Sequence, residues 1–450
     1  MDQLLFWIAV PLLTAIVALW CLTRLWRVIK IGTAYKAKIL CSAIFVSGRE
    51  IDPSRADEVS ADSYWPLRLF RARIDHASRS VTTSFLGLRQ CTATCRPGLG
   101  ATLGRGASLQ SIEAVKAPRT PVDPWPRESP SPQLQRVVES AFAEHNPKRL
   151  RRTRAVIVVG GGRIVAEHYA PGITEQTPLP GWSITKSVLG ALVGILVGQG
   201  RLPLTGRELL PEWRAPDPRA AIQLEDLLRM RSGLQFSEIY SDLSSDVVRM
   251  LFDCRDAAAY AASRPLISPP GSTWSYSSGT SNILSRIVRN VVGDSEYLRW
   301  PRRTLFDPVG MTSAVMETDA SGTFVCSSFM LATASDWARF GQLYLQDGMS
   351  NGLRILPEGW VAFCKSPTLQ SPDGRYGAHW WLKLPPELGG ETPAAARVPA
   401  DAFFALGHEG QTLTVIPSAQ LVVVRLGLSI YVDAWNHAAF LAQIRNALDF

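Results

Sequence analysis

Cysteine is scarce in this sequence, and the cysteines present form no recognisable framework. Seven cysteines among 450 residues are too few and too scattered for a disulfide scaffold. Cys91 and Cys95 lie four residues apart, which leaves open a disulfide between them or with Cys41. No second cysteine or histidine pair completes a zinc site. We therefore expect no metal and no other cofactor.

Lysine is scarce as well, because only eight of the 47 basic residues are lysines. The formal net charge of +8 comes mainly from arginines spread along the chain without any block of like charges. No stripe of basic and aromatic residues accompanies this charge. The charge therefore indicates a solvated surface, and nucleic acid is excluded as a partner.

The N-terminus carries a long uncharged apolar run. After a short tail at residues 1–3, residues 4–22 contain no charge, and this length is close to the ~20 residues that a helix needs to cross a membrane. No basic residues precede the run and no Ala-x-Ala cleavage site follows it, which favours a retained anchor over a cleaved signal peptide. The basic residues that follow predict a cytoplasmic body: Arg24, Arg27, Lys30, Lys36 and Lys38.

The rest of the chain divides at a proline-rich stretch. The lead segment 23–116 carries mixed signals, with a short strand predicted at 43–46 and a turn at 96–100. Six prolines in residues 117–132 exclude a regular helix and indicate an extended connector. We therefore place the main domain at 133–450.

The main domain begins and ends with strand signals and is mainly helical between them. A hairpin is predicted from 155–159 and 164–169, and a second from 413–416 and 421–426, followed by a helix over 433–448. Such an order predicts an α/β domain of the α+β type, in which one antiparallel sheet is assembled from both ends of the domain around an inserted helical lobe.

The sharpest chemical signal is Ser183 followed by Lys186. The apolar run over 184–199 predicts a buried helix, with Ser183 at its N-terminal end and Lys186 one turn later on the same face. A lysine whose ammonium form is disfavoured by burial is able to take the serine proton, and the helix N-terminus supplies N–H groups for an oxyanion. A capping serine beside a solvated lysine is the alternative.

Two further residues lie in small-residue loops. Tyr276 stands in the loop over 270–279 ahead of a predicted helix, where a phenol is able to relay a proton. His408 belongs to the segment 407–411, which runs directly into the strand at 413–416. Taken singly, each is also compatible with an ordinary turn aromatic or a satisfied loop histidine.

Together, the three positions resemble the serine β-lactamase and DD-peptidase superfamily. Its motifs are Ser-x-x-Lys, then Tyr-x-Asn or Ser-x-Asn, then Lys-Thr-Gly or His-x-Gly. The resemblance extends over 155–428 and includes Leu-Arg-Met-Arg-Ser-Gly-Leu at 228–234. It looks closest to class C-like esterases and the 6-aminohexanoate-dimer hydrolase group, through the segments 276–279, 354–360 and 377–381.

The resemblance implies a role for each position. Ser183 would be acylated, Lys186 and Tyr276 would share acid and base duty in an order left open, and the backbone N–H groups of Ser183 and Gln411 would form the oxyanion hole. Ser278 replaces the usual asparagine and His408 replaces the usual lysine, which disfavours antibiotic hydrolysis. The expected substrate-binding residues are Ser278, His408, Gly410, Tyr240, Trp380 and Trp381.

One motif is excluded. Residues 348–352 match the Gly-x-Ser-x-Gly pattern of α/β-hydrolases, but that pattern requires a strand before it and a helix after it. Here a helical run precedes it, and the segment is predicted to be a turn.

The expected function is a membrane-anchored serine hydrolase for a small or linear amide or ester. Alternatives are a DD-peptidase or weak β-lactamase, a penicillin-type sensor that is acylated without turnover, and a degenerate scaffold. Members of the superfamily usually lie outside the cytoplasmic membrane, which favours a catalytic domain on the periplasmic side of a bacterial inner membrane. The basic residues after the apolar run predict the opposite, a cytoplasmic domain. The expected partners are thus a small substrate and the membrane.

Overall fold

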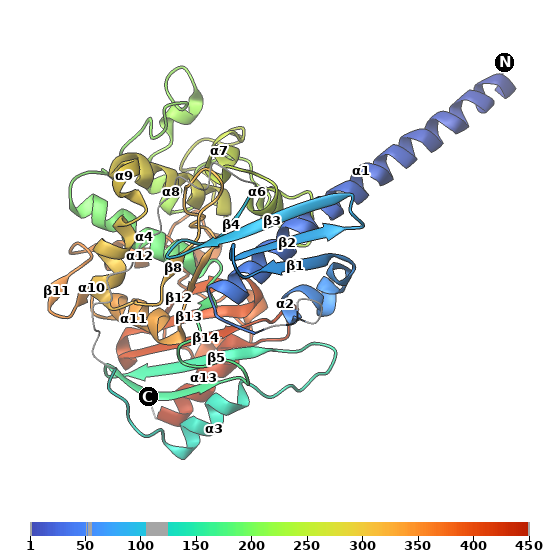
Figure 1. Cartoon of the computed structure of the whole chain (residues 1–450). Helices are drawn as coiled ribbons and strands as arrows, with labels where there is room; N and C mark the ends of the chain where they lie inside the picture. Colours follow the sequence, from blue (N-terminus) through green and yellow to red (C-terminus); the bar gives the residue numbers. More distant parts are fainter. Residues whose placement is uncertain (1, 51, 53–55, 105–124, 449–450) are drawn as a thin grey trace.

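The computed structural model describes residues 2–50, 52, 56–104 and 125–448. Its first element is the helix α1 (Asp2–Phe45), whose N-terminal part projects from the body of the protein (Figure 1). Among the described residues it is the one helix long and apolar enough to cross a membrane, which is consistent with an anchor or a signal sequence. The strand predicted at 43–46 is wrong, because the helix continues to Phe45 and Val46 lies in the turn that follows.

The second half of α1 is packed inside the protein. From Ile29 onwards most of its side chains are buried, and Leu40 has no exposed surface. Two short helical segments follow, α2 (Asp57–Ser60) and a 3-10 helix (Asp62–Leu69). An antiparallel sheet in the order β1-β2-β3-β4 then packs on α1: β1 (Arg71–Asp75), β2 (Ser80–Phe85), β3 (Arg89–Arg96) and β4 (Gly100–Leu103). The predicted turn at 96–100 joins β3 to β4.

This N-terminal part shares a core with the rest of the molecule. Leu40, Val81 and Leu99 belong to the same hydrophobic cluster as Val159 and Val188. The division of the chain at 117–132 stays a prediction, and residues 117–124 of that connector lie outside the described residues.

The central sheet is antiparallel and is built from both ends of the following region. Its order is β12-β13-β14-β5-β6, so that strands from the C-terminal end continue directly into the first hairpin. The two predicted hairpins are confirmed, and an edge strand that was not predicted is added. The bounds are β5 (Thr153–Gly160), β6 (Arg163–Tyr169), β12 (Phe403–Gly407), β13 (Gln411–Ile416) and β14 (Leu421–Gly427).

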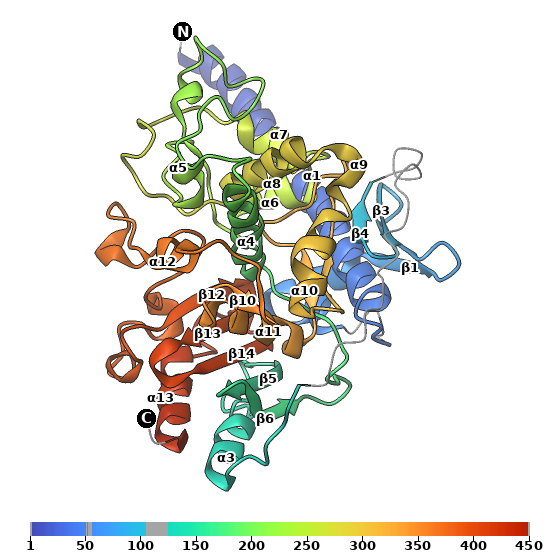
Figure 2. The ribbon, with the colours of Figure 1, turned by 90° about the vertical axis from the view of Figure 1, so that its left-hand side faces the viewer.

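Helices cover both faces of this sheet, as Figure 2 shows. One face carries α3 (Pro132–Ser140) and α13 (His437–Leu448), and the other carries α4 (Ile184–Gly198) and α11 (Ala334–Leu345). The inserted lobe and its surroundings contain α5 (Leu224–Leu228), α6 (Asp246–Phe252), α7 (Ala257–Ala262), α8 (Ser278–Val292), α9 (Asp294–Tyr297), α10 (Asp307–Val309) and α12 (Trp360–Lys365).

Short strands complete the structure. β7 (Leu179–Pro180), β9 (Met330–Ala332) and β8 (Val315–Met316) form one small sheet. β10 (Met349–Ser350) and β11 (Leu353–Arg354) form a short hairpin, so the predicted turn lies at Asn351 and Gly352 and the middle of the Gly-x-Ser-x-Gly segment is the strand β10.

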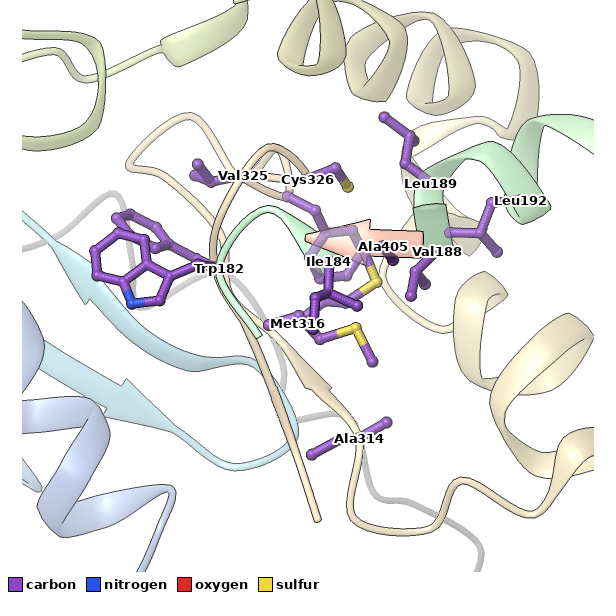
Figure 3. Packing of buried hydrophobic residues seen from close by; sticks show 14 of the residues in the cluster. Trp182, Ile184, Val188, Leu189, Leu192, Ala314, Met316, Val325, Cys326 and Ala405 are labelled. Carbon is purple, nitrogen blue, oxygen red and sulfur yellow. The ribbon is translucent and has the colours of Figure 1, made fainter. Parts of the chain in front are cut away.

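The helix α4 is buried on nearly all sides because its residues are almost entirely apolar. Figure 3 shows Ile184 and Val188 of α4 packed near Ala405 of β12 and Met316 of β8. Trp182 lies on the opposite side of the segment that enters the helix. The start of α4 is thereby fixed beside the edge strand of the central sheet.

Candidate active site

The start of α4 brings Ser183 and Lys186 together. The Nζ atom of Lys186 lies 2.8 Å from the Oγ atom of Ser183, as the three-residue spacing on a helix predicts. The approach to the helix is tight: a Cβ atom on Gly181 would lie 2.4 Å from the Trp337 ring, and Trp182 has a φ of +49°. Among the described residues, the N–H of Ser183 has no hydrogen-bond acceptor, so it is free to bind an oxyanion.

Lys186 is almost completely removed from solvent. Besides Ser183, its Nζ atom donates to Oγ of Ser278 at 3.1 Å and to the carbonyl of Ser327 at 2.9 Å. Burial lowers the pKa of Lys186 to about 8, and the charge of Glu238 opposes this shift. A neutral amine is therefore readily formed near neutral pH, as a general base requires.

Tyr276 faces the same two residues from the loop before α8. Its ring centroid lies 5.0 Å from Nζ of Lys186. Burial and the charge of Glu238 raise the pKa of Tyr276, and its contact with Ser183 opposes the rise. The phenol therefore holds its proton at neutral pH and is suited to donate it. Trp381 packs against it with ring centroids 5.4 Å apart.

Glu238 is a site residue that the sequence analysis did not single out. Its carboxylate accepts hydrogen bonds from the backbone N–H of Ser278 at 2.8 Å and from the Ser278 hydroxyl at 2.5 Å. Partial burial raises the pKa of Glu238, and the charge of Lys186 opposes the rise. The sequence offered no signal for it beyond its place two residues before Tyr240.

His408 and Tyr240 form an aromatic wall beside Ser183. Their rings stack with centroids 4.3 Å apart, and the Trp182 ring meets His408 edge-on at 5.2 Å. Burial lowers the pKa of His408 to about 4, so its imidazole is neutral at physiological pH. The Tyr240 hydroxyl is buried near the hydroxyls of Ser278 and Ser328, which oppose the rise in its pKa that burial causes.

These residues line one cavity of about 240 Å³. Its outer wall is mainly apolar, with Leu388, Ile430 and Val432 among the lining residues. None of the described residues that line it is a lysine or an arginine. A glutamate of the outer wall, Glu387, adds negative charge. Apart from Lys186, whose amine contacts Ser183 from behind this lining, the described residues of the cavity offer no cation to a carboxylate.

Comparison with known protein families shows the family of this chain. A family model described as Beta-lactamase matches residues 138–427, which is well over half of the chain. The chain belongs to the beta-lactamase family. Its α/β fold and its standing as a serine hydrolase of this family agree with the resemblance seen in the sequence.

Similar proteins include a 6-aminohexanoate-dimer hydrolase and a carboxylesterase. The chain is 26% identical over 301 residues to the 6-aminohexanoate-dimer hydrolase of Paenarthrobacter ureafaciens, covering 61% of this chain and 72% of that protein. A Bacillus anthracis structure, provisionally named 6-aminohexanoate-dimer hydrolase, shares 22% identity with a TM-score of 0.57, covering 72% and 86% of the two chains. A family VIII carboxylesterase shares 16% identity with a TM-score of 0.54, covering 72% and 99%.

Four expected site residues of this beta-lactamase-family chain do not line the cavity: Lys186 and Ser278, which contact each other behind Ser183, and Trp380 and Gln411. Trp380 is fully buried between Tyr344 and Phe403, with ring centroids 4.5 and 4.9 Å away, so it is a core residue and that expectation is corrected. The Gln411 side chain points inward and donates to the carbonyl of Gly427 at 2.7 Å. The oxyanion role expected for the Gln411 backbone stays a prediction.

The remaining predicted residues lie together. Ser183, Tyr276, His408 and Gly410 line the cavity along with Trp381. Ser278 lies directly behind them, in contact with Lys186. Within the part of the chain that the structure describes, no cluster of histidine, cysteine, aspartate or glutamate is arranged to hold a metal.

Proposed function

We propose that the protein hydrolyses a small or linear amide or ester through an acyl-enzyme on Ser183, with α1 as a membrane anchor. The observation that carries this proposal is the contact of 2.8 Å between a buried lysine amine and the Ser183 hydroxyl. A serine becomes an effective nucleophile only when a neighbouring base accepts its proton.

Each proposed step has a residue in place. Neutral Lys186 takes the proton as Oγ of Ser183 attacks the substrate carbonyl, and the N–H of Ser183 stabilises the oxyanion with a second donor, expected at Gln411. Tyr276 passes a proton to the leaving amine or alcohol. Water then attacks the acyl-enzyme, and the same groups act in reverse. The lowered pKa of Lys186 and the raised pKa of Tyr276 support this division of roles.

The cavity supports substrates without a carboxylate next to the scissile bond. β-Lactams and peptidoglycan peptides carry such a carboxylate, and a buried carboxylate without a cationic partner is costly. His408 is neutral, and the described lining of the cavity contains no lysine or arginine. Similarity to a 6-aminohexanoate-dimer hydrolase supports a linear amide as the substrate class. A peptidoglycan or β-lactam substrate is the second candidate.

The membrane part of the proposal concerns α1. Its exposed apolar side chains between Val10 and Val28 support insertion into a bilayer. We place the body of the protein on the periplasmic side of a bacterial inner membrane. A C-terminal reporter that is active only in the periplasm tests this placement: we expect an active reporter, and an expressed but inactive one would place the body of the protein in the cytoplasm.

Intact-mass analysis tests the catalytic proposal. The full chain in detergent is exposed to a fluorophosphonate and separately to p-nitrophenyl butyrate, alongside Ser183→Ala. Covalent labelling and repeated turnover, both lost in Ser183→Ala, are the expected result. Labelling without repeated turnover would instead indicate a sensor, and an unreactive wild type would indicate a scaffold.

A further inference from the structure

The N-terminal part of the chain reaches the candidate active site through Tyr64. This residue belongs to the 3-10 helix Asp62–Leu69, well before the region matched by the family model. Its hydroxyl donates to Oε1 of Glu409 at 2.9 Å and lies 3.5 Å from Nε2 of His408. Both residues belong to the turn that lines the cavity beside Ser183. A segment outside the family region therefore contacts the wall of the site.

The turn that Tyr64 contacts is conformationally strained. Glu409 has a φ of +63° and Trp182 a φ of +49°, in a region that residues other than glycine rarely occupy. The indole N–H of Trp182 donates to Oε2 of Glu409 at 3.2 Å. The Glu409 carboxylate thus links the cavity turn to Trp182, the residue before Ser183, through one oxygen, and accepts the Tyr64 hydrogen bond at the other. Such strain persists only where surrounding contacts maintain it.

Tyr64 itself is firmly supported by α1. Its ring lies 5.2 Å from the ring of Tyr35, measured between centroids. Lys36 donates to the carbonyls of Leu67 and Phe70 at 2.9 and 2.8 Å, which fixes the C-terminal end of the 3-10 helix against α1. These contacts with α1 therefore hold the Tyr64 side chain in place beside Glu409.

We propose that Tyr64 is a positioning residue of the active site, whose hydrogen bond to Glu409 holds the cavity turn and the approach to Ser183 in the arrangement that reacts with substrate. The 3-10 helix Asp62–Leu69 then completes the site as well as packing against α1. The proposal rests on hydrolysis at Ser183, so its effects are measured relative to the activity of the wild type.

The ionisation of Glu409 distinguishes positioning from a general loss of stability, because a merely destabilised protein would keep the same pH dependence of kcat/KM. Burial raises the pKa of Glu409 to about 7, and the Tyr64 hydrogen bond opposes the rise. Loss of the Tyr64 hydroxyl should therefore raise this pKa further, because the ionised form loses a donor. The titratable and charged groups around Glu409 include Tyr35 and Lys38 in α1, Glu58 in α2, Tyr64, Arg154 in β5, Glu317, the adjacent His408 and Arg425 in β14.

The test compares Tyr64→Phe with Trp65→Phe in the full chain, using p-nitrophenyl butyrate. Trp65 is the next residue and is 59% exposed, so its substitution controls for changes to the same helix. We expect Tyr64→Phe to lower kcat/KM about tenfold, the size of one lost hydrogen bond to a charged group. Because positioning requires ionised Glu409, the rise of kcat/KM with pH should reflect both Glu409, with a pKa of about 7, and Lys186, with a pKa of about 8, and Tyr64→Phe should move only the Glu409 part to higher pH. Trp65→Phe should match the wild type in both respects.

A second variant, Glu409→Gln, tests whether the pH shift caused by Tyr64→Phe acts through the ionisation of Glu409. Glu409→Gln keeps an acceptor for Tyr64 but removes the ionisation, so adding Tyr64→Phe to it should no longer shift the pH profile. An unchanged kcat/KM and pH profile in Tyr64→Phe would overturn the proposal, as would the same pH shift in the Glu409→Gln background. An inactive wild type would instead refute hydrolysis at Ser183.

Discussion

The Nζ atom of Lys186 lies 3.1 Å from the Oγ atom of Ser278, which stands where the superfamily usually has asparagine. Ser278 in turn donates to the partly buried carboxylate of Glu238. A negative charge is thereby connected to the proposed base through one hydroxyl, and this charge raises the pKa of Lys186 against the effect of burial.

The pH dependence of activity should follow the neutral fraction of Lys186. Because deprotonated Lys186 is the proposed base and its pKa is about 8, kcat/KM should rise with pH through this value. Glu238→Gln removes the charge that raises this pKa, so the rise should move to lower pH. Initial rates of ester hydrolysis between pH 5 and 10, corrected with Ser183→Ala, measure the shift. A shift to higher pH or no shift would contradict the link to Glu238.

Ser278→Ala should impair catalysis more than Ser278→Thr. Alanine removes the hydroxyl between Lys186 and Glu238, whereas threonine retains one. The loss of a hydrogen bond to a charged group costs about 1.5–3 kcal/mol, so kcat should fall roughly tenfold to a hundredfold in Ser278→Ala. Single-turnover acylation by p-nitrophenyl butyrate checks this. Equal rates for both variants would show that the hydroxyl has no catalytic effect.

Substrate charge should decide reactivity. A neutral ester should be hydrolysed, whereas nitrocefin, which carries a carboxylate, should react at least about a hundredfold more slowly because the described lining of the cavity offers its carboxylate no cation. Leu388→Lys, in the cavity wall, should raise kcat/KM for nitrocefin. Leu369→Lys is the control, because Leu369 is 88% exposed and lies outside the cavity lining. Efficient nitrocefin hydrolysis by the wild type would refute this selectivity.

Shortening the chain should have very different effects at two points. A chain that starts at residue 29 keeps the buried half of α1 and should stay soluble and active. A chain that starts at residue 117 loses Leu40, Val81 and Leu99 from the common core. Each buried apolar side chain of this size contributes about 1.5–3 kcal/mol, so this chain should aggregate or melt far lower. Thermal unfolding measures both, and equal Tm values would contradict the shared core.

The close approach of two backbone segments can be tested at Gly407. A Cβ atom there would lie 2.2 Å from the carbonyl oxygen of Gly181, two residues before Ser183. Gly407→Ala should therefore push the cavity turn away from Ser183 and lower both Tm and kcat/KM. The control is Gly160→Ala, where the nearest atom would lie at 3.6 Å. Wild-type kinetics in Gly407→Ala would show that the turn tolerates the displacement.

Local sequence patterns were sufficient for the elements that depend on neighbouring residues. The contact of Ser183 with Lys186 follows from three-residue spacing on one helix, and both hairpins follow from alternating strands around turn residues. The strand expected at 43–46 failed because Ile44 and Phe45, although they are β-forming residues, pack half-buried against the core from the end of α1, so that tertiary packing overrides local preference.

Residues distant in sequence were not predictable in the same way. Glu238 and Ser278 are forty residues apart, and nothing in their local context indicates that they meet. Trp380 and Trp381 are adjacent, yet only Trp381 lines the cavity, because Trp380 lies in the bend that contains His379 (φ +57°) and packs between Tyr344 and Phe403.

The sequence by itself determined the family's motifs, the sheet assembled from two ends and the apolar N-terminal run, because each depends on residue types at short spacing. Only the tertiary structure decided that Tyr64 meets Glu409 and that Lys186 is surrounded by Ser278 and Ser327. Those contacts depend on how whole elements pack, and packing is fixed by the combined burial of many side chains and not by any local pattern.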